Sequence, residues 1–476
     1  MAFNQYNLER VHDQSRGAFD LFVYYHDTDT IADVLADGYF DEGKFGFKSP
    51  GNNPKLINVK AADGDVSIRL IGDVASKVFS QADINNVVEY TENIAPANDV
   101  NRVVFYGKKD PFLGAGFIDE DNSLATITPE SGGVGLTNEI RYFDDPTLFR
   151  HNGALQEFTS SGGLQLLQID LDGGTTGGNT GQGFDSTSSE FTVKTDAQSI
   201  AFELLDNADF CVKVDGVFVS KTPVSFSSGG FQKLLVDFPS KKVREVTVCA
   251  PRAAAVFRGV FILPTDTIYK PAQSKKVAFI TDSFGVGLTV DRAGQHWPDI
   301  ISSGMGWDNY LVNGRSGTGF INKSAGNTYN FFERIPQVAA WNPELVVVNC
   351  SINDENETES DLTSAVTNFI NTITVALPNA RIVVVGAIGR NDSGSIFVET
   401  AVKNAIDAIG HDNVVFVPSQ LQTSDGWVFG TGRVGTTTSD GNADIYINTD
   451  GTHFTASGQV YWAQRLMQGM LEAGVY

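Results

Sequence analysis

Two short segments in the C-terminal half of the chain contain the residue types that nucleophilic catalysis needs. Ser283 lies in the sequence TDSF, directly after an apolar run and just before two glycines. His453 lies in the sequence DGTH, a turn-like stretch before the last amphipathic segment. A serine hydroxyl becomes a good nucleophile when an imidazole takes its proton. Three residues of loop bring the Asp450 carboxylate within reach of Nδ1 of His453, which fixes the tautomer and leaves Nε2 for the serine.

Acyl transfer also needs hydrogen-bond donors for the oxyanion that develops on the substrate. Gly314 follows a short apolar run, and a glycine lets a backbone N–H approach a substrate closely. Asn353 follows the apolar run LVVVNC and offers a side-chain amide. Each of these segments follows a predicted strand or precedes the last predicted helix, so one edge of a sheet can collect them all.

The elements that must position these residues alternate between strand and helix. Short, nearly continuous apolar runs, typical of strands buried on both faces, occupy residues 276–280, 345–350, 381–388 and 413–418. Helical spacing of apolar residues occurs at 359–377, at 397–410 and after Thr455. The pattern predicts a parallel α/β sheet, and ligands of such sheets bind at the carboxyl ends of the strands.

The four segments together resemble the SGNH (GDSL-type) hydrolase family, and the likeness covers residues 273–476. The family's Gly-Asp-Ser-Leu, second-block Gly, Gly-x-Asn-Asp and Asp-x-x-His blocks match residues 281–284, Gly314, residues 351–354 and residues 450–453, in the family's order. The resemblance implies a flavodoxin-like, three-layer α/β fold with no cofactor and no metal. It assigns the site as follows: Ser283 is the nucleophile, His453 the base, Asp450 the residue that orients it, and Ser283 N–H, Gly314 N–H and the Asn353 amide form the oxyanion hole.

Two residues depart from the family pattern. Thr281 and Ser351 stand where the first and third blocks have glycine, which puts the local backbone in question if a positive φ is needed there. Each motif also has a structural interpretation. Ser283 can cap a helix, Asn353 can cap the next segment, and Gly314 or the Asp450 segment can form a turn. The order of all four motifs favours an active site.

The first part of the chain predicts all-β structure. Residues 1–90 hold strand-like runs at 21–25 and 66–71 and are expected to form a small β-domain. Residues 24–41 resemble a short domain of bacteriophage virion proteins, which implies attachment to a virion. Residues 91–150 contain one strand-like run, at 102–106, and are interpreted as a connector or a continuation of the first domain, without a fold class.

Residues 151–270 are interpreted as an accessory β-sandwich, jelly-roll-like, that precedes the α/β domain. Runs of near-alternating polarity, separated by turn residues, recur between Leu164 and Pro264. The glycine-rich stretch at 172–183 lacks the residue order of a phosphate-binding loop and is expected to be a flexible loop.

Composition excludes several classes of function. Lys plus Arg number 34 against 57 Asp plus Glu, a net charge of -23, so nucleic acid and anionic lipid are poor partners. The three cysteines form no C-x-x-C pair, which argues against a disulfide framework or a thiolate zinc site, although pairing of Cys211 with Cys249 stays open. No apolar run is long enough for membrane insertion, and the N-terminus lacks the pattern of a signal peptide.

The other histidines and three tryptophans are not assigned to the site. No role is given to His12, His26, His151, His296 and His411. The core is the expected place of Trp297, Trp307 and Trp427.

The candidate site predicts a serine esterase. The resemblances imply that it removes O-acyl groups, in the first instance O-acetyl groups, from a bacterial surface polysaccharide. The expected partners are that polysaccharide and other phage virion proteins. A homo-oligomer is a further expectation, a trimer if the chain is a spike. The expected location is the virion or the extracellular space after synthesis in the host cytoplasm. Two alternatives stay open: a receptor-binding or structural virion protein with a non-catalytic SGNH fold, and a lipase or thioesterase of the same family.

Overall fold

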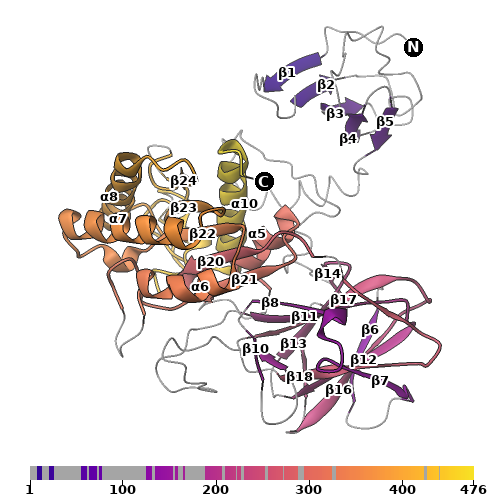
Figure 1. Ribbon diagram of the computed structural model, residues 1–476. Coiled ribbons are helices and arrows are strands. Elements are labelled where there is room, and N and C mark those ends of the chain that lie inside the picture. Colours follow the sequence, from indigo (N-terminus) through magenta and orange to yellow (C-terminus); the bar gives the residue numbers. More distant parts are fainter. Residues whose placement is uncertain are drawn as a thin grey trace. The chain divides into compact units, whose positions relative to one another are not determined.

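The computed structural model describes five strands within the first 101 residues and most of the chain after residue 124 (Figure 1). The described residues are 8–12, 21–25, 55–61, 64–71, 74–77, 125–130, 135–153, 156–158, 164–166, 188–205, 209–220, 222–226, 230–251, 256–271, 273–287, 294–323, 329–422, 426–438 and 440–475. Contacts divide the chain into two compact units, Met1–Asn101 and Arg102–Tyr476. The strand expected at 102–106, the loop expected at 172–183 and most of the virion-like segment at 24–41 lie outside the described residues.

The described residues of the first unit form a five-stranded sheet in the order β1-β2-β3-β4-β5. Its strands are β1 (Leu8–His12), β2 (Leu21–Tyr25), β3 (Lys55–Ala61), β4 (Gly64–Ile71) and β5 (Val74–Lys77). The pair β2–β3 is parallel and the other three pairs are antiparallel. The runs predicted at 21–25 and 66–71 are β2 and the greater part of β4.

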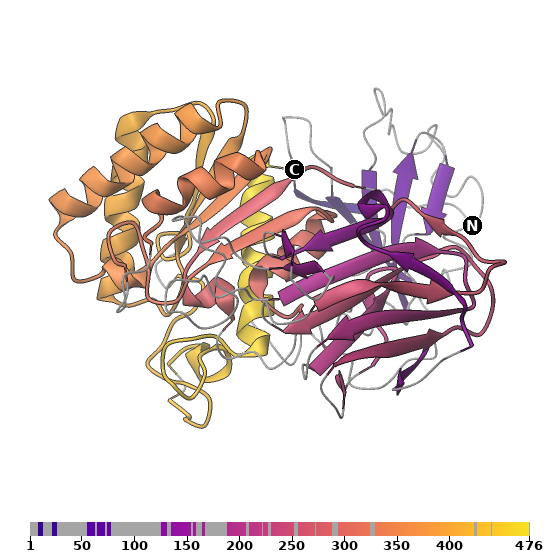
Figure 2. The same cartoon turned by 60° about the horizontal axis from the view of Figure 1, so that its bottom comes forward.

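The second unit begins with two antiparallel sheets that enclose a common apolar core (Figures 1 and 2). One sheet has the order β6-β16-β12-β18-β10-β9 with β7 beside β18, and the other has the order β14-β13-β17-β11-β19 with β8 beside β11 and β15 beside β13. The strands are β6 (Thr126–Glu130), β7 (Asn138–Arg141), β8 (Phe149–Asn152), β9 (Gln156–Phe158), β10 (Leu164–Leu166), β11 (Ser188–Thr195), β12 (Ser199–Leu205), β13 (Asp209–Val214), β14 (Val217–Phe218), β15 (Val224–Ser225), β16 (Phe231–Asp237), β17 (Arg244–Pro251), β18 (Val256–Ile262) and β19 (Ile268–Tyr269).

Side chains along the strands of this sandwich point alternately into the core and away from it. Along β16 every second residue is buried, as expected for a strand with one face on a core. Phe191 of β11 and Phe257 of β18 meet across the two sheets with ring centroids 4.9 Å apart. The strands β6 and β7 come from the stretch at 91–150 that has no clear sequence pattern, and they pair with β16 and β18 of the sandwich.

The rest of the second unit is a parallel five-stranded sheet in the order β21-β20-β22-β23-β24, which confirms the predicted parallel sheet. Its strands are β20 (Val277–Thr281), β21 (Tyr310–Gly314), β22 (Leu345–Cys350), β23 (Arg381–Ala387) and β24 (Val414–Val417). The longer helices are α5 (Trp297–Met305), α6 (Ile335–Trp341), α7 (Glu359–Ala376), α8 (Ser393–Ile409) and α10 (Ala456–Glu472), and the short ones are α4 (Ser283–Val286) and α9 (Ala443–Tyr446). Helix α8 starts earlier than predicted, because Asp392 accepts a hydrogen bond from Ser395 N–H and caps it.

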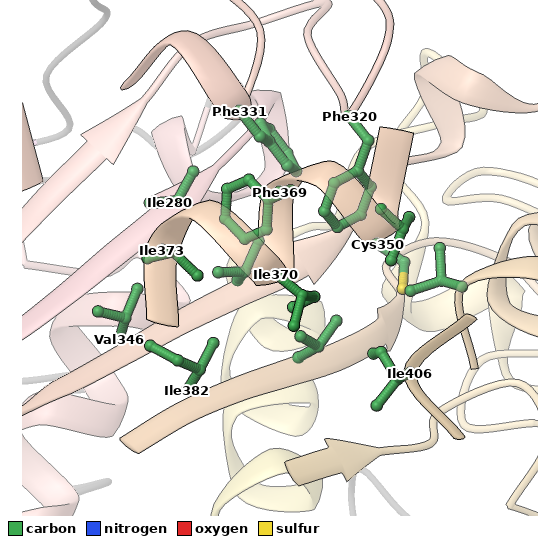
Figure 3. Packing of buried hydrophobic residues seen from close by; sticks show 14 of the residues in the cluster. Ile280, Phe320, Phe331, Val346, Cys350, Phe369, Ile370, Ile373, Ile382 and Ile406 are labelled. Atoms are coloured by element: carbon green, nitrogen blue, oxygen red, sulfur yellow. The ribbon is translucent and has the colours of Figure 1, made fainter. Parts of the chain in front are cut away.

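Both faces of this sheet are covered, as the continuous apolar strands require. Helices α6, α7 and α8 lie over one face, while α5 and α10 lie over the other (Figures 1 and 2). Figure 3 shows Phe369, Ile370 and Ile373 of α7 gathered with Val346 and Ile382 of the strands. Their spacing of three and four residues puts them on one side of the helix. On the opposite face, Phe279 of β20 meets Trp297 of α5 with ring centroids 5.4 Å apart.

The sandwich and the parallel sheet are joined by backbone hydrogen bonds at the outer strand β21. Gly153, just after β8, pairs in parallel with Leu311. Its N–H donates to Tyr310 O at 3.1 Å, and its carbonyl accepts from Val312 N–H at 2.7 Å. Gly153 has a φ of 101°, which only glycine adopts without strain. The edge of β21 is therefore covered by a segment of the sandwich.

None of the described helices is both long and apolar enough to span a lipid bilayer.

Candidate active site

The carboxyl ends of three neighbouring strands bring the predicted site residues to one edge of the sheet. Strand β20 ends at Thr281, and Ser283 opens helix α4 directly after it. Strand β21 ends at Gly314, which pairs with Thr281 in the parallel register. Strand β22 is followed by a short 3-10 turn, Ile352–Asp354, that contains Asn353. This arrangement follows from the parallel topology, since all strands end on the same side.

Ser283, His453 and Asp450 form a continuous chain of hydrogen bonds. The Nε2 atom of His453 lies 2.9 Å from Oγ of Ser283. The Nδ1 atom of His453 lies 2.6 Å from Oδ2 of Asp450. The other carboxylate oxygen, Oδ1, accepts hydrogen bonds from the N–H groups of Thr452 at 2.9 Å and His453 at 3.0 Å. The carboxylate thus fixes the imidazole with a proton on Nδ1, so that Nε2 can accept the serine proton.

The electrostatics of Asp450 favour its ionised form. Partial burial works to raise the pKa of Asp450, but the hydrogen bonds from Thr452 N–H, from the His453 ring and from His453 N–H outweigh it and hold the pKa below its usual value. Asp450 therefore carries a negative charge at neutral pH and can stabilise an imidazolium on His453.

Backbone contacts hold the turn that carries Asp450 and His453. Gly451 has a φ of 79°, a left-handed conformation suited to glycine. Arg390 donates from Nη2 to Gly451 O at 2.6 Å and from Nη1 to Thr431 O at 3.0 Å. Asn448 N–H donates to His453 O at 2.7 Å. These hydrogen bonds hold the turn that contains His453 in one conformation.

The short helix that presents Ser283 depends on close packing and on a buried carboxylate. A Cβ at Gly285 would lie 2.2 Å from Cγ2 of Thr281, so only glycine allows this turn to pack onto its own strand. Asp282 is fully buried and accepts hydrogen bonds from Phe284 N–H at 3.0 Å and from Ser351 Oγ at 2.6 Å. Burial raises the pKa of Asp282, against the opposing effect of these donors.

The two departures from the family pattern cause no backbone strain. Ser351 has φ −102° and ψ 126°, an ordinary extended conformation. Among the described non-glycine residues, positive φ occurs at Asp215 and Asn342, and Thr281 is not one of them. Thr281 and Ser351 therefore do not need the left-handed conformation that favours glycine. The Ser351 hydroxyl instead supplies the hydrogen bond to Asp282.

Asn353 sits at the expected edge, but its amide is already engaged. Its Nδ2 atom donates to Thr318 O at 3.0 Å and to Ser351 Oγ at 2.8 Å. A primary amide has two N–H groups, so each has an acceptor within the protein. An oxyanion that forms in the site must therefore share or displace one of these hydrogen bonds.

Two further buried side chains, those of Asp354 and Arg334, hold the backbone around the site. Asp354 is buried, and its carboxylate accepts hydrogen bonds from the backbone N–H groups of Phe320 at 2.7 Å and Asn322 at 2.9 Å. Arg334 is also fully buried and donates to carbonyl groups at the ends of β20 and β21. Asp354 falls in the third block, whereas Arg334 lies in a stretch that has no motif signal.

The other histidines, the tryptophans and the cysteines of the described residues lie outside the proposed hydrogen-bonded chain. His151 lies in β8 of the sandwich, and His411 Nδ1 accepts from Asn413 N–H at 3.1 Å. His296 occupies the N-cap position of α5 without a side-chain capping hydrogen bond. The three tryptophans predicted in the core, Trp297, Trp307 and Trp427, are buried. Cys211 and Cys249 are opposite each other on β13 and β17, and both are free thiols. Within the described part of the chain, no group of three or more His, Cys, Asp or Glu side chains is arranged to hold a metal.

Comparison with known proteins agrees with this architecture. Residues 280–460 match the model of the GDSL-like Lipase/Acylhydrolase family. A salicylyl-acyltransferase from a tetracycline biosynthetic pathway has a similar structure, with a TM-score of 0.53 and 16% identity over 71% of this chain and 98% of that one. No curated protein matches the chain in sequence.

Two further similar structures are esterases by name. A family two carbohydrate esterase from Clostridium thermocellum has a TM-score of 0.49 and 14% identity, covering 68% of this chain and 98% of its own. An acetyl xylan esterase from the rumen bacterium Butyrivibrio proteoclasticus has a TM-score of 0.48 and 12% identity, covering 71% of this chain and 100% of its own. The family match spans the segments that carry Ser283, Gly314, Asn353 and His453, so the C-terminal region of this chain is a GDSL-like lipase/acylhydrolase (SGNH) domain.

Proposed function

We propose that the C-terminal domain is a serine ester hydrolase in which Ser283 is the nucleophile, His453 the general base and Asp450 the residue that orients the base. The observation that carries this proposal is the hydrogen-bonded chain from Ser283 Oγ through the two ring nitrogens of His453 to Asp450. A serine, an imidazole and an ionised carboxylate in this order are what acyl transfer to a hydroxyl requires.

The reaction proceeds in two halves. Ser283 Oγ attacks the ester carbonyl carbon while His453 Nε2 takes the hydroxyl proton, and the carbonyl oxygen becomes an oxyanion. Collapse of this intermediate breaks the bond to the alcohol oxygen, which receives the proton from His453, and leaves an acyl group on Ser283. A water molecule, deprotonated by His453, then attacks the acyl carbon, and Ser283 leaves with that proton as the carboxylic acid departs.

The N–H groups of Ser283 and Gly314 and the amide of Asn353 are the proposed donors to the oxyanion. Gly314 ends β21, Ser283 follows the end of the adjacent strand β20, and Asn353 follows β22, the next strand of the sheet. Backbone donors at fixed strand ends stabilise charge without having to reorganise during the reaction.

The proposed substrate is an O-acylated, in the first instance O-acetylated, bacterial surface polysaccharide. Its support is the sandwich domain, which is hydrogen-bonded to β21, the strand that ends at Gly314. A β-sandwich placed before an SGNH domain resembles the accessory modules of carbohydrate esterases. A polymer that contacts both domains contributes binding energy at a distance from the scissile ester.

The setting proposed for this activity is a bacteriophage particle, where the first unit attaches the chain to the virion. The support is the resemblance of residues 24–41 to phage virion proteins. On a virion or in the extracellular space, a deacylase would act on the host surface before infection.

Acetate release from a panel of O-acetylated bacterial polysaccharides tests this function, with Ser283→Ala as the control. Wild-type protein should release acetate from at least one polymer, and the variant should release none above background. Binding of polymer without acetate release would instead support a non-catalytic virion protein. Turnover confined to long-chain esters or thioesters would assign the domain to a lipase or thioesterase.

A further inference from the structure

A single buried arginine contacts the backbone of both strands that carry the proposed oxyanion donors. Arg334 is fully buried, in a short 3-10 turn, Phe332–Arg334, before α6. Its Nη1 atom donates to Thr281 O at 2.9 Å and to Asn313 O at 2.8 Å. Its Nη2 atom donates to Oγ1 of Thr318. The guanidinium thus spans the ends of β20 and β21 and the loop that follows β21.

Two of these contacts hold peptide groups at or next to a proposed oxyanion donor. The carbonyl of Asn313 belongs to the same planar peptide group as the N–H of Gly314, so a donor that fixes the carbonyl also fixes that N–H. The carbonyl of Thr281 shares its peptide group with the N–H of Asp282, so this contact fixes the chain one residue before the Ser283 N–H. A hydrogen bond to a carbonyl also polarises its peptide group, which strengthens the N–H as a donor.

The third contact leads to Asn353. Thr318 Oγ1, which accepts from Arg334, donates in turn to Arg315 O at 2.7 Å, so the hydroxyl is fixed on both sides. The carbonyl of the same residue, Thr318 O, accepts from Asn353 Nδ2 at 3.0 Å. The position of Thr318 therefore helps to set where the Asn353 amide points.

We propose that Arg334 is a positioning residue of the oxyanion hole, which aligns the Gly314 peptide, the Ser283 turn and the Asn353 amide through Asn313, Thr281 and Thr318. This inference rests on the proposed ester hydrolysis. Arg334 is not a catalytic residue, because it acts through the peptide groups and side chains that it holds.

The charge of Arg334 adds to this role. Burial lowers the pKa of Arg334 to about 9, while the nearby Asp282 opposes the shift. The guanidinium is therefore still protonated at neutral pH, where its positive charge lies close to the strand ends. A fixed positive charge in a poorly solvated region favours negative charge that develops nearby.

The test compares turnover per active site in the full-length chain, with an aryl acetate as substrate. Active sites are counted by stoichiometric labelling with a fluorophosphonate, so that a loss of folded protein is not mistaken for a loss of rate. The variants are Arg334→Met, Arg334→Lys and Thr318→Val. The matched control is Arg244→Met, because Arg244 is also a buried arginine that donates to backbone carbonyls, those of Ala197 and Ser240, but lies in the sandwich.

We expect Arg334→Met to lower kcat per labelled site by about 30- to 100-fold and Thr318→Val by about 3- to 10-fold, with KM within about twofold of the wild-type value. Arg334→Lys should fall between Arg334→Met and wild type, because an ammonium keeps the charge but cannot reproduce the planar fork. Arg244→Met should lower thermal stability and leave kcat per site unchanged.

An unchanged kcat per site in Thr318→Val and Arg334→Lys would overturn the inference and leave Arg334 as a structural residue. An equal loss in Arg244→Met would do the same, since the effect would then be one of stability. If Arg334→Met does not fold, the kcat values of Thr318→Val and Arg334→Lys test the role of Arg334. A wild-type protein without turnover would overturn the proposed function, and this inference with it.

Discussion

Gly153 of the sandwich pairs in parallel register with Leu311 of the outer strand β21. Since β21 ends at Gly314, the segment that follows β8 borders the strand that presents a proposed oxyanion donor. The two domains of the second unit are thus coupled through a backbone contact at the same strand. A change at this junction is therefore expected to affect the hydrolase domain as well as the sandwich.

A buried ion pair lies close to this junction. Lys213 Nζ of β13 is 2.6 Å from Glu190 Oε1 of β11, and both side chains are buried. Burial alone would raise the pKa of Glu190, but the charge and hydrogen bond of Lys213 hold it below its usual value. A Cβ on Gly294, in the segment before α5, would lie 3.1 Å from Lys213 Nζ, so the backbone of the α/β domain approaches the pair closely.

Lys213→Met should lower the free energy of unfolding by about 3 to 5 kcal/mol, because it leaves the Glu190 carboxylate buried without its partner. The double variant Lys213→Met, Glu190→Gln should recover a large part of that loss. Urea denaturation of the full chain at neutral pH measures both. Equal stabilities of the single and double variants would contradict the assignment of the loss to an uncompensated charge.

Acid should destabilise the fold through His296. Burial lowers the pKa of His296 to about 4 from the ordinary value of 6.5, against a smaller opposing effect of the Val286 backbone. Between these two pH values the unfolded chain binds a proton that the folded chain does not. His296 therefore does not reduce the free energy of unfolding above pH 6.5. As the pH falls from 6.5 towards 4, protonation of this histidine in the unfolded chain reduces the free energy of unfolding.

The measurement is the free energy of unfolding at about pH 7 and about pH 4.5. His296→Gln should reduce its pH dependence by about 2 to 3 kcal/mol relative to wild type. His411→Gln, at an exposed histidine, serves as the matched control for the substitution itself. A His296→Gln variant with the wild-type pH dependence would show that His296 does not remain neutral in the folded protein.

Asn353→Ala should lower kcat by roughly 100- to 1,000-fold with little change in KM, as expected for a donor that acts mainly in the transition state. The existing hydrogen bonds of Asn353 to Thr318 O and Ser351 Oγ must then be shared with the oxyanion. Steady-state kinetics on an aryl acetate measure the split between kcat and KM. Asn413→Ala, which removes an amide bonded to Pro378 O, is the control. A normal kcat in Asn353→Ala would mean that this amide only holds the loop.

Asp450→Asn should lower kcat by roughly 1,000-fold or more, because an amide offers no charge to an imidazolium and can hold His453 in the wrong tautomer. The fold should be retained, since Asp450 lies in a partly exposed turn. Kinetics at neutral pH, with circular dichroism to verify folding, test this expectation. Asp407→Asn, at an exposed carboxylate paired with Lys403, should keep wild-type activity. A loss below about tenfold for Asp450→Asn would remove this residue from the proposed triad.

The sequence predicted those elements whose signal is local. The apolar run at 345–350 is strand β22, and the helical spacing at 359–377 is α7, because burial on two faces or on one stripe leaves a pattern within a short window. Ser283, His453 and Asp450 lie in short motifs at strand or helix ends, so the sequence alone indicates them as candidates.

Features that depend on distant parts of the chain could not be predicted in this way. Strands β6 and β7 are short and acquire partners far along the sequence, β16 and β18, so a local window holds little evidence for them. Arg334 resembles any other arginine in the sequence, and its contacts with Thr281 and Asn313 arise only when the sheet has formed. The hydrogen bonds that occupy the Asn353 amide are likewise visible only in three dimensions.

The proposed mechanism depends on Ser283 as the nucleophile, and covalent labelling identifies the nucleophile. Full-length protein is treated with a fluorophosphonate, digested, and analysed by mass spectrometry to locate the adduct. We expect one adduct per chain, on Ser283, and no labelling of the Ser283→Ala variant. His453→Ala should react much more slowly, because Ser283 then lacks the base that lies 2.9 Å away. An adduct on another serine, or no adduct in a preparation that hydrolyses esters, would contradict the proposed mechanism.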